Sequence, residues 1–359
     1  MSWSLKFLQL GDTQLRVHVT FFLLLVFIAA QRWQAGPLAA AEGVLFVVLV
    51  FVCVVLHELG HVVAAQRYGI RTPTITVLPI GGVAQLERMP DRPVAELVVA
   101  IAGPLVNVVI AAVLFVLIGA RFDFSDMDQL QAAQTSLQGR LAAVNVLLVV
   151  FNLIPAFPLD GGRIFRALLA FKLPRARATR VAARTGQAMA VLFAIVGIFY
   201  NPFLLLIAIF MFFAAEAEAS HETMRADTSG HVARDAMITR FESLAPDQTA
   251  EDAGRLLILT TQQEFPVVGA DGRLLGMVTR KGLIEAMGRD GPRTPVSAFM
   301  IDRVETMPPD APLEQVMSVL YQSPARAVAI GRGPRGFDGY VSAENANELF
   351  MLDRARRQR

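Results

Sequence analysis

The stretch VVLHELGHVV, Val54–Val63, places two histidines and a glutamate inside an apolar run. Ionisable side chains at membrane depth are costly, so their presence in such a run indicates a functional site. On an α-helix, four residues advance about 400° and rise about 6 Å, and both His57 and His61 would therefore lie on one face. This is the H-E-x-x-H pattern, in which the two imidazoles bind one metal ion and the glutamate, here Glu58, acts on a metal-bound water.

The composition favours an integral membrane protein. Hydrophobic residues make up 54% of the 359-residue chain, more than the roughly 45–50% of soluble domains. The single cysteine excludes a disulfide framework within the chain, and the net charge of +2 is too small to indicate nucleic-acid binding. We expect no cleavable signal peptide, because the first apolar run follows a polar segment and lacks a small-residue cleavage site.

Apolar segments long enough to cross a bilayer fill the first part of the chain. A transmembrane helix needs about 20 mostly apolar residues. Segments of this kind occur at 17–35, 43–66, 95–119, 140–158, 185–200 and 203–219. We therefore predict a polytopic α-helical membrane domain over residues 1–222, with about six transmembrane helices.

The distribution of Lys and Arg predicts the orientation of this domain, because cytoplasmic loops are enriched in both. The connection after the third segment is acidic, with Asp123, Asp126 and Asp128. The connections after the second and fourth segments are basic, with Arg67, Arg71, Arg88, Arg92, Arg163, Arg166, Lys172, Arg175, Arg177, Arg180 and Arg184. Both termini are thus expected in the cytoplasm, in a multi-pass protein of the inner (cytoplasmic) cell membrane.

A repeat begins where the composition turns soluble, near residue 230. Met237-Ile238 matches Met300-Ile301, and Gly276 matches Gly339, each at an offset of 63 residues. Each copy has the pattern strand, helix, strand, strand, helix. We predict two α/β modules, over residues 230–290 and 291–352.

A second polar motif, NLIPAFPLDGGR at Asn152–Arg163, ends the fourth apolar segment. The predicted orientation puts Asp160 at the same depth as the two histidines, which makes it a candidate third metal ligand. Pro155 would break the helix before it, and Gly161 would allow the chain to turn. An alternative role for Asp160 is to cap the helix that follows.

Together, HELGH, AGPLVN at Ala102–Asn107 and NLIPAFPLDGG resemble the site-2 protease family of intramembrane zinc metalloproteases. The tail is similar to the tandem CBS domains that one subfamily carries. The resemblance implies that His57, His61 and Asp160 bind one Zn²⁺ per chain and that Glu58 activates the water. It also implies that the second to fourth helices form the membrane core.

The function implied is zinc-dependent endopeptidase activity in regulated intramembrane proteolysis. The bond cleaved would lie in or near a transmembrane segment of a membrane-associated protein, close to the cytoplasmic face. A CBS-regulated channel or transporter is an alternative, although its polar residues would be spread over several helices rather than gathered at one depth. A third possibility, an inactive relative that acts as a scaffold, is disfavoured by the intact Glu58.

Other polar residues near the motifs have two readings each. Asn152 is a candidate for binding the substrate backbone or the developing oxyanion, or for satisfying carbonyls at the helix break. Asn107 follows Gly103-Pro104, where the small residue and the missing N–H suit close helix packing or a kink, and we expect a structural role here. For His18, we expect an interfacial or core position rather than a role as a metal ligand. The segment TITVLPIGGVAQL, 74–86, is a predicted hairpin whose edge could pair with an extended substrate.

The CBS resemblance implies an adenine nucleotide in the cleft between the modules. Nucleotide-binding examples have an aspartate three residues after a Ser or Thr near the last strand. Here Gly282 stands at that spacing from Thr279, and Asn345 from Ser342. Nucleotide binding and a role in homodimerisation or docking therefore both remain open, with no nucleotide-binding residue assigned.

Overall fold

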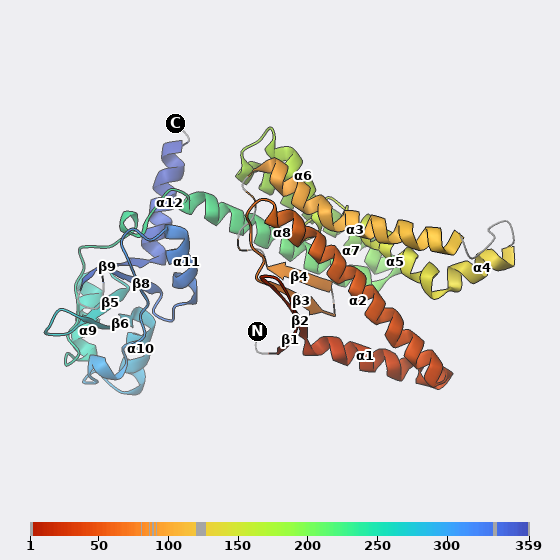
Figure 1. The fold of residues 1–359 in the computed structure, drawn as a ribbon. Coiled ribbons are helices and arrows are strands. Elements are labelled where there is room, and N and C mark those ends of the chain that lie inside the picture. The colour runs from red at the N-terminus through yellow and green to blue at the C-terminus, as the bar shows by residue number, and fades with distance from the viewer. Residues whose placement is uncertain are drawn as a thin grey trace. The chain divides into compact units, whose positions relative to one another are not determined.

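The computed structural model describes residues 3–79, 81–85, 87, 90, 92–119, 127–332 and 336–357. The chain divides into two compact units, Met1–Ser220 and His221–Arg359 (Figure 1). The part of the acidic connection that contains Asp123 and Asp126 lies outside the described residues.

Four helices within the described residues are long and apolar enough to cross a membrane. They are α2 (Pro37–Gln66), α3 (Pro93–Gly119), α7 (Arg175–Tyr200) and α8 (Pro202–Thr228). They match the second, third, fifth and sixth predicted segments. The other two segments form shorter apolar helices, α1 (Val19–Arg32) and α5 (Leu137–Asn152), so the count of six spans stays a prediction.

The fourth apolar segment ends as a helix earlier than predicted. α5 stops at Asn152, and the chain continues without regular structure until α6 (Asp160–Ala170) begins. A Cβ on Gly161 would lie 2.2 Å from the carbonyl oxygen of Ile154. Only glycine allows α6 to start this close to the preceding turn, and Asp160 is thereby placed at the buried N-terminal end of α6.

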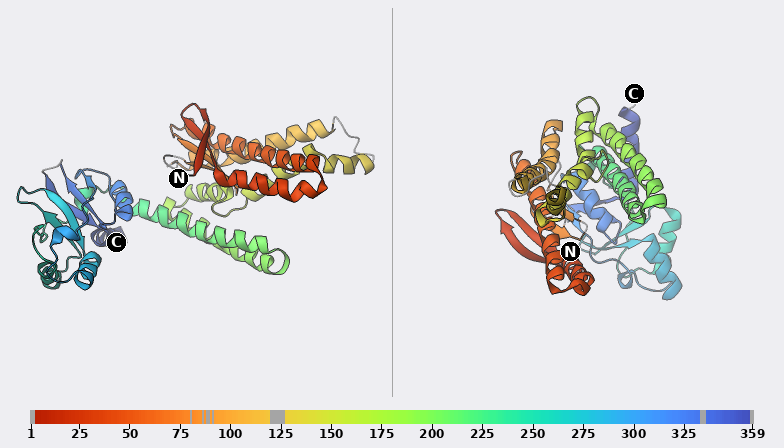
Figure 2. Two further views of the ribbon diagram at one scale, coloured as in Figure 1. Left: turned by 90° about the horizontal axis from the view of Figure 1, so that it is seen from below. Right: turned by 90° about the vertical axis from the view of Figure 1, so that its right-hand side faces the viewer.

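The segments at 4–10 and 74–85 join in one four-stranded sheet, visible beside α2 (Figure 2). Its order is β1 (Ser4–Leu10), β2 (Thr13–His18), β3 (Thr74–Leu78) and β4 (Gly81–Gln85). β2 and β3 are parallel, whereas β3 and β4 form the predicted antiparallel hairpin. One face of β2 and β3 packs on α2 through Val17, Ile75 and Val62. β4 is therefore an edge strand next to α2.

The central helices of the first unit are packed around α3, which contacts α2, α5 and α6 (Figure 1). α4 (Met127–Thr135) is a short helix that packs on α5. This arrangement brings the HELGH face of α2 toward the start of α6.

The second unit consists of two copies of the predicted pattern, and their helices and strands follow one another in the predicted order. The first copy contains α9 (Ala250–Leu259), β5 (Glu264–Val268), β6 (Leu274–Thr279) and α10 (Arg280–Arg289). The second contains β7 (Thr306–Met307), α11 (Leu313–Gln322), β8 (Ala327–Gly331), β9 (Phe337–Ser342) and α12 (Ala343–Arg357). In the first copy, isolated bridges take the place of the leading strand.

The two copies exchange their leading segments. Ile238 of the first copy bridges to β9, and Ile301 of the second bridges to Met277 on β6. A Cβ on Gly339 would lie 2.2 Å from the carbonyl oxygen of Ile238, and one on Gly276 would lie 2.7 Å from that of Ile301. The repeated glycine thus provides the space for the exchanged segment to approach the strand.

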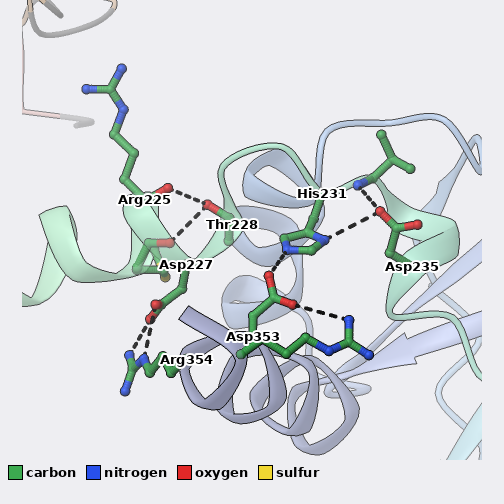
Figure 3. A network of polar contacts seen from close by, with 10 residues as sticks. Arg225, Asp227, Thr228, His231, Asp235, Asp353 and Arg354 are labelled. Atoms are coloured by element: carbon green, nitrogen blue, oxygen red, sulfur yellow. Dashed lines mark hydrogen bonds and ion pairs between the residues drawn. The ribbon is translucent and has the colours of Figure 1, made fainter. Parts of the chain in front are cut away.

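Polar contacts hold α12 to the chain that leaves α8 (Figure 3). The Arg354 guanidinium donates to the Asp227 carboxylate, with Nε 3.1 Å from Oδ1. His231 Nε2 lies 2.6 Å from Asp353 Oδ2. Within α8 itself, the Thr228 hydroxyl donates to the carbonyl oxygen of Met224 at 2.9 Å. The contacts of Arg354 and Asp353 fix the C-terminal helix at the start of the second unit.

Candidate metal centre

Three side chains predicted as ligands meet at one point. His57 and His61 project from α2, and Asp160 is the first residue of α6. Asp160 Oδ2 lies 3.1 Å from His57 Nε2 and 3.2 Å from His61 Nε2, and the two Nε2 atoms are 3.2 Å apart. All three residues are buried. The histidine pair and the aspartate are thus gathered as the sequence led us to expect.

The geometry of these three atoms fits a tetrahedral metal ion. Ligand atoms about 2.0–2.1 Å from a tetrahedral zinc are about 3.3 Å from one another, close to the separations found here. Two imidazole nitrogens and a carboxylate oxygen are also a donor set that zinc accepts. Without a cation or a shared proton, three electron-rich atoms at such distances would repel one another. The three side chains are therefore a group that could hold a metal ion.

A backbone carbonyl sets the tautomer of His61. Its Nδ1 lies 2.7 Å from the carbonyl oxygen of Val99 on α3. A carbonyl can only accept, so Nδ1 must carry the hydrogen and Nε2 has a free lone pair. His57 Nδ1 contacts the amide oxygen of Asn107. Both rings therefore present Nε2 to the same point.

Gly103 makes room for the two imidazoles. A Cβ at this position on α3 would lie 2.3 Å from His61 Nε2 and 2.7 Å from His57 Nε2. Both distances are far below van der Waals contact. From the sequence, Gly103-Pro104 was expected to serve close helix packing or a kink, and the closeness of Gly103 to the imidazoles was not predicted.

Glu58 is half-buried and faces β4. A Cβ on Gly82 would lie 2.7 Å from Cγ of Glu58 and 3.2 Å from its Oε1. The glycine thus lets the edge strand pass directly against this carboxylate. Glu58 is not in the group of three ligand atoms, in agreement with a role other than ligation.

The remaining candidates lie in other surroundings. Asn152 is the half-buried last residue of α5. His18 caps α1, its Nδ1 accepting from the amide of Thr20 at 3.3 Å. In the second unit, Thr279 caps α10 by accepting from the amide of Gly282 at 3.1 Å.

The second copy uses its polar residues in a similar way. The Ser342 hydroxyl accepts from the amide of Asn345 at 3.2 Å. The Asn345 side chain donates to the carbonyl oxygen of Ala236 at 3.1 Å. This amide, the closest substitute for the missing carboxylate, is therefore occupied by the backbone of the first copy.

An ion cluster near the site was not predicted. Arg166 on α6 is completely buried, and its Nη2 lies 2.6 Å from Glu96 Oε1 on α3. Arg166 also pairs with Glu218 on α8, and Glu96 Oε2 lies 3.3 Å from Arg175 Nη1 on α7. In the sequence, both arginines were interpreted only as charges of a basic connection. The cluster joins α3, α7 and α8 to the helix that carries Asp160.

Comparison with protein families identifies both parts of the chain. Peptidase family M50 matches residues 45–126 and 123–193, which include HELGH and NLIPAFPLDGG. The CBS domain family matches residues 233–289. The first match contains all three candidate ligands, and the second contains the first copy of the repeat.

One curated relative shows the family, and two further proteins are similar to this chain. A zinc metalloprotease of Methanocaldococcus jannaschii is 34% identical over 77% of this chain and 78% of its own length. Rip3 of Mycobacterium tuberculosis, also named as a zinc metalloprotease, is 29% identical over 86% of this chain and 80% of its own. The solved site-2 protease from M. jannaschii has 36% identity and a TM-score of 0.46, covering 60% of this chain and 95% of that one.

Proposed function

This chain belongs to peptidase family M50, the site-2 protease family of zinc metalloproteases, and from this premise we propose that His57, His61 and Asp160 hold its zinc ion, one per chain, and that Glu58 is its general base. The observation that carries the proposal is the mutual spacing of the three ligand atoms, 3.1–3.2 Å. The transporter and scaffold alternatives have no comparable support.

The residues divide the chemistry of peptide hydrolysis between them. When bound, zinc supplies a water whose pKa is lowered to about 7 and polarises the substrate carbonyl. Glu58, beside the ligands but not one of them, takes the proton of the attacking water and passes it to the leaving nitrogen. Asn152 remains a candidate for binding the substrate backbone, since it lies half-buried at the end of α5.

The substrate class proposed is a membrane protein cleaved in or near a transmembrane segment. A peptide in a helix hides its amides in hydrogen bonds, so it must be extended before attack. β4 supports this step, because it is an edge strand and its Gly82 lies against Glu58. An extended substrate would add to this edge and bring its peptide bond to the carboxylate.

The proposed orientation places both termini and the metal centre toward the cytoplasmic face. Arg175 and Arg180 at the start of α7 support it, as does the basic connection after α5. Cleavage would then occur at the cytoplasmic side of the membrane.

For the CBS pair we propose a regulatory role exerted through homodimerisation. Ile258 and Leu259 on α9 are 86% and 73% exposed, and Ile284 on α10 is 56% exposed. Large apolar side chains exposed together on neighbouring helices are typical of an interaction surface. The same unit has a cavity of about 500 Å³ beside Thr279 and Arg280, with glutamates as well as basic side chains in its lining. Because the Asn345 side chain is engaged by the backbone, a nucleotide there is the weaker proposal.

The activity is tested by finding new protein termini in membranes. The purified chain, reconstituted with membrane proteins of its own cell, should produce cleaved termini within apolar segments. Glu58→Gln should yield none, because the water would lack its base, and chelation of zinc should abolish them in wild type. Identical termini in Glu58→Gln would exclude the proposed role of Glu58.

A further inference from the structure

A chain of hydrogen bonds leads from α5 to His57 through two buried amides. Asn107 on α3 and Asn145 on α5 are both completely buried. Asn107 Nδ2 donates to Asn145 Oδ1 at 2.8 Å, and Asn107 Oδ1 contacts His57 Nδ1. Asn145 Nδ2 in turn donates to the carbonyl oxygen of Leu141 at 2.9 Å and lies 3.4 Å from Cys53 Sγ.

The direction of this chain is set at its far end. The Leu141 carbonyl can only accept, so Asn145 must turn its amino group toward it and its oxygen toward Asn107. Asn107 must then offer its amino group to Asn145 and its oxygen to His57. A reversed Asn107 would place two oxygens against each other, which is unfavourable in a buried site. His57 Nδ1 therefore faces the Asn107 oxygen, which accepts a hydrogen bond, and so Nδ1 must carry the hydrogen.

We propose that Asn145 and Asn107 are positioning residues that hold His57 in the tautomer with hydrogen on Nδ1 and a free lone pair on Nε2. The inference rests on the ligand set of the proposed function. His61 receives the same orientation directly from a backbone carbonyl, whereas His57 receives it through two side chains. Groups that orient a ligating histidine in this way change metal affinity by about 10- to 100-fold when they are removed.

Zinc affinity of the full chain in detergent tests the proposal, measured by competition with a chelator. Asn145→Leu keeps the volume but removes the amide, so Asn107 loses its fixed direction. We expect zinc to bind about 10- to 100-fold more weakly. Val146→Leu, an exposed neighbour on the same helix, is the matched control and should bind zinc like wild type.

A second substitution separates orientation from packing. In Asn145→Leu, the further change Asn107→Asp places an oxygen against His57 Nδ1 whichever way the side chain turns. The double variant should therefore recover most of the lost affinity. If the two asparagines act only by packing, a second change in the same buried site should weaken binding again.

Unchanged zinc affinity in Asn145→Leu, or no recovery in the double variant, would overturn the proposal. The ¹⁵N NMR shifts of His57 in metal-free wild type provide a test without any substitution. Hydrogen on Nδ1 is expected because the Asn107 oxygen accepts from it, and an Nδ1 without hydrogen would refute the assignment. If wild type binds no zinc, the ligand set itself fails; if it binds zinc but Asn145→Leu binds equally well, only this inference fails.

Discussion

The metal centre depends on three side chains and on the groups that orient their rings, the Asn107 oxygen for His57 and the Val99 carbonyl for His61. The spacing of His57 and His61 predicts a shared helix face from local geometry alone. Asp160 could be predicted only by combining its depth in the membrane with the orientation of the chain. Asn145 could not be found in this way, because its partner Asn107 is 38 residues away in the sequence and nothing local distinguishes it from a packing residue.

Replacing Gly103 with alanine should abolish tight zinc binding. The added Cβ would come within 2.3 Å of His61 Nε2 and 2.7 Å of His57 Nε2, so at least one imidazole must leave its place. A loss of zinc affinity of about 10-fold or more is expected by analogy with displaced ligand-orienting groups. Titration with a chelator measures it.

Gly288→Ala serves as the control for that substitution. Gly288 lies in α10, and a Cβ there would meet no atom within 4 Å. Its zinc affinity should equal that of wild type. Wild-type affinity in Gly103→Ala as well would mean that the imidazoles have more room than the structure gives them.

At the scale of elements, apolar length predicted the long helices well and the short ones poorly. α2, α3, α7 and α8 agree with predicted segments. The fourth segment was drawn too long, because the chain from Leu153 to Leu159 remains apolar although it is not helical. The hairpin was predicted, but its neighbours were not: which of β3 and β4 is the edge depends on the distant pairing of β2 with β3.

That pairing decides which substitution tests the substrate edge. Proline at Val77 would remove a hydrogen bond from an interior strand and disturb the sheet itself. Proline on β4 is the better probe, because β4 is the edge strand. Neighbouring residues of a strand point their N–H groups to opposite sides, so one of two adjacent residues points its N–H away from β3. Of Val83→Pro and Ala84→Pro, one should lower cleavage by about 10-fold or more while zinc stays bound, because it removes the outward N–H that pairs with the substrate.

Phe7→Pro is the matched control, on the strand at the opposite edge of the same sheet. Phe7 lies at an irregularity of the β1–β2 ladder, where proline is tolerated best. Its cleavage rate should be unchanged. Wild-type cleavage by both β4 variants would rule out strand addition.

The buried ion cluster should contribute strongly to stability. Arg166→Met removes the cation closest to Glu96, a nearly fully buried carboxylate, and leaves it the longer contact with Arg175. Removing one member of a buried ion pair costs about 3–5 kcal/mol. We expect a lower midpoint of unfolding in detergent. Arg289→Ala, which breaks an exposed pair with Asp290, should change the midpoint little; equal midpoints for both variants would argue against a structural role for the cluster.

At the scale of the whole molecule, the repeat and the change in composition predicted two kinds of unit. The exchange of leading segments between the copies was not predictable, since it depends on the contacts of Ile238 with β9 and of Ile301 with β6. The match of Gly276 and Gly339 was visible in the sequence, but its reason became clear only from the backbone that each glycine admits.

The stability of the second unit should fall as pH rises from about 5 to 7. Burial, together with repulsion from Glu344, raises the pKa of Glu264 to about 7 from 4.5. Between these two pKa values the folded unit keeps a proton that the unfolded chain releases, so increasing pH favours unfolding. Above about pH 7 both states have lost the proton, and the free energy of unfolding no longer changes through this group. Thermal unfolding of the full chain across this pH range should show the decrease.

Glu264→Gln removes the titrating group and should flatten that dependence. The comparison is made on the transition of the second unit, followed by hydrogen exchange in β5 and β6. Parallel pH profiles for wild type and Glu264→Gln would show that another group is responsible.

We propose that a zinc ion is held by His57, His61 and Asp160, with Glu58 outside the ligand set. The zinc content of the purified chain in wild type, Glu58→Gln and Asp160→Ala tests this. We expect about one zinc per chain in the first two and a clear loss in the third. Absence of zinc from folded wild type, or full retention in Asp160→Ala, would contradict it.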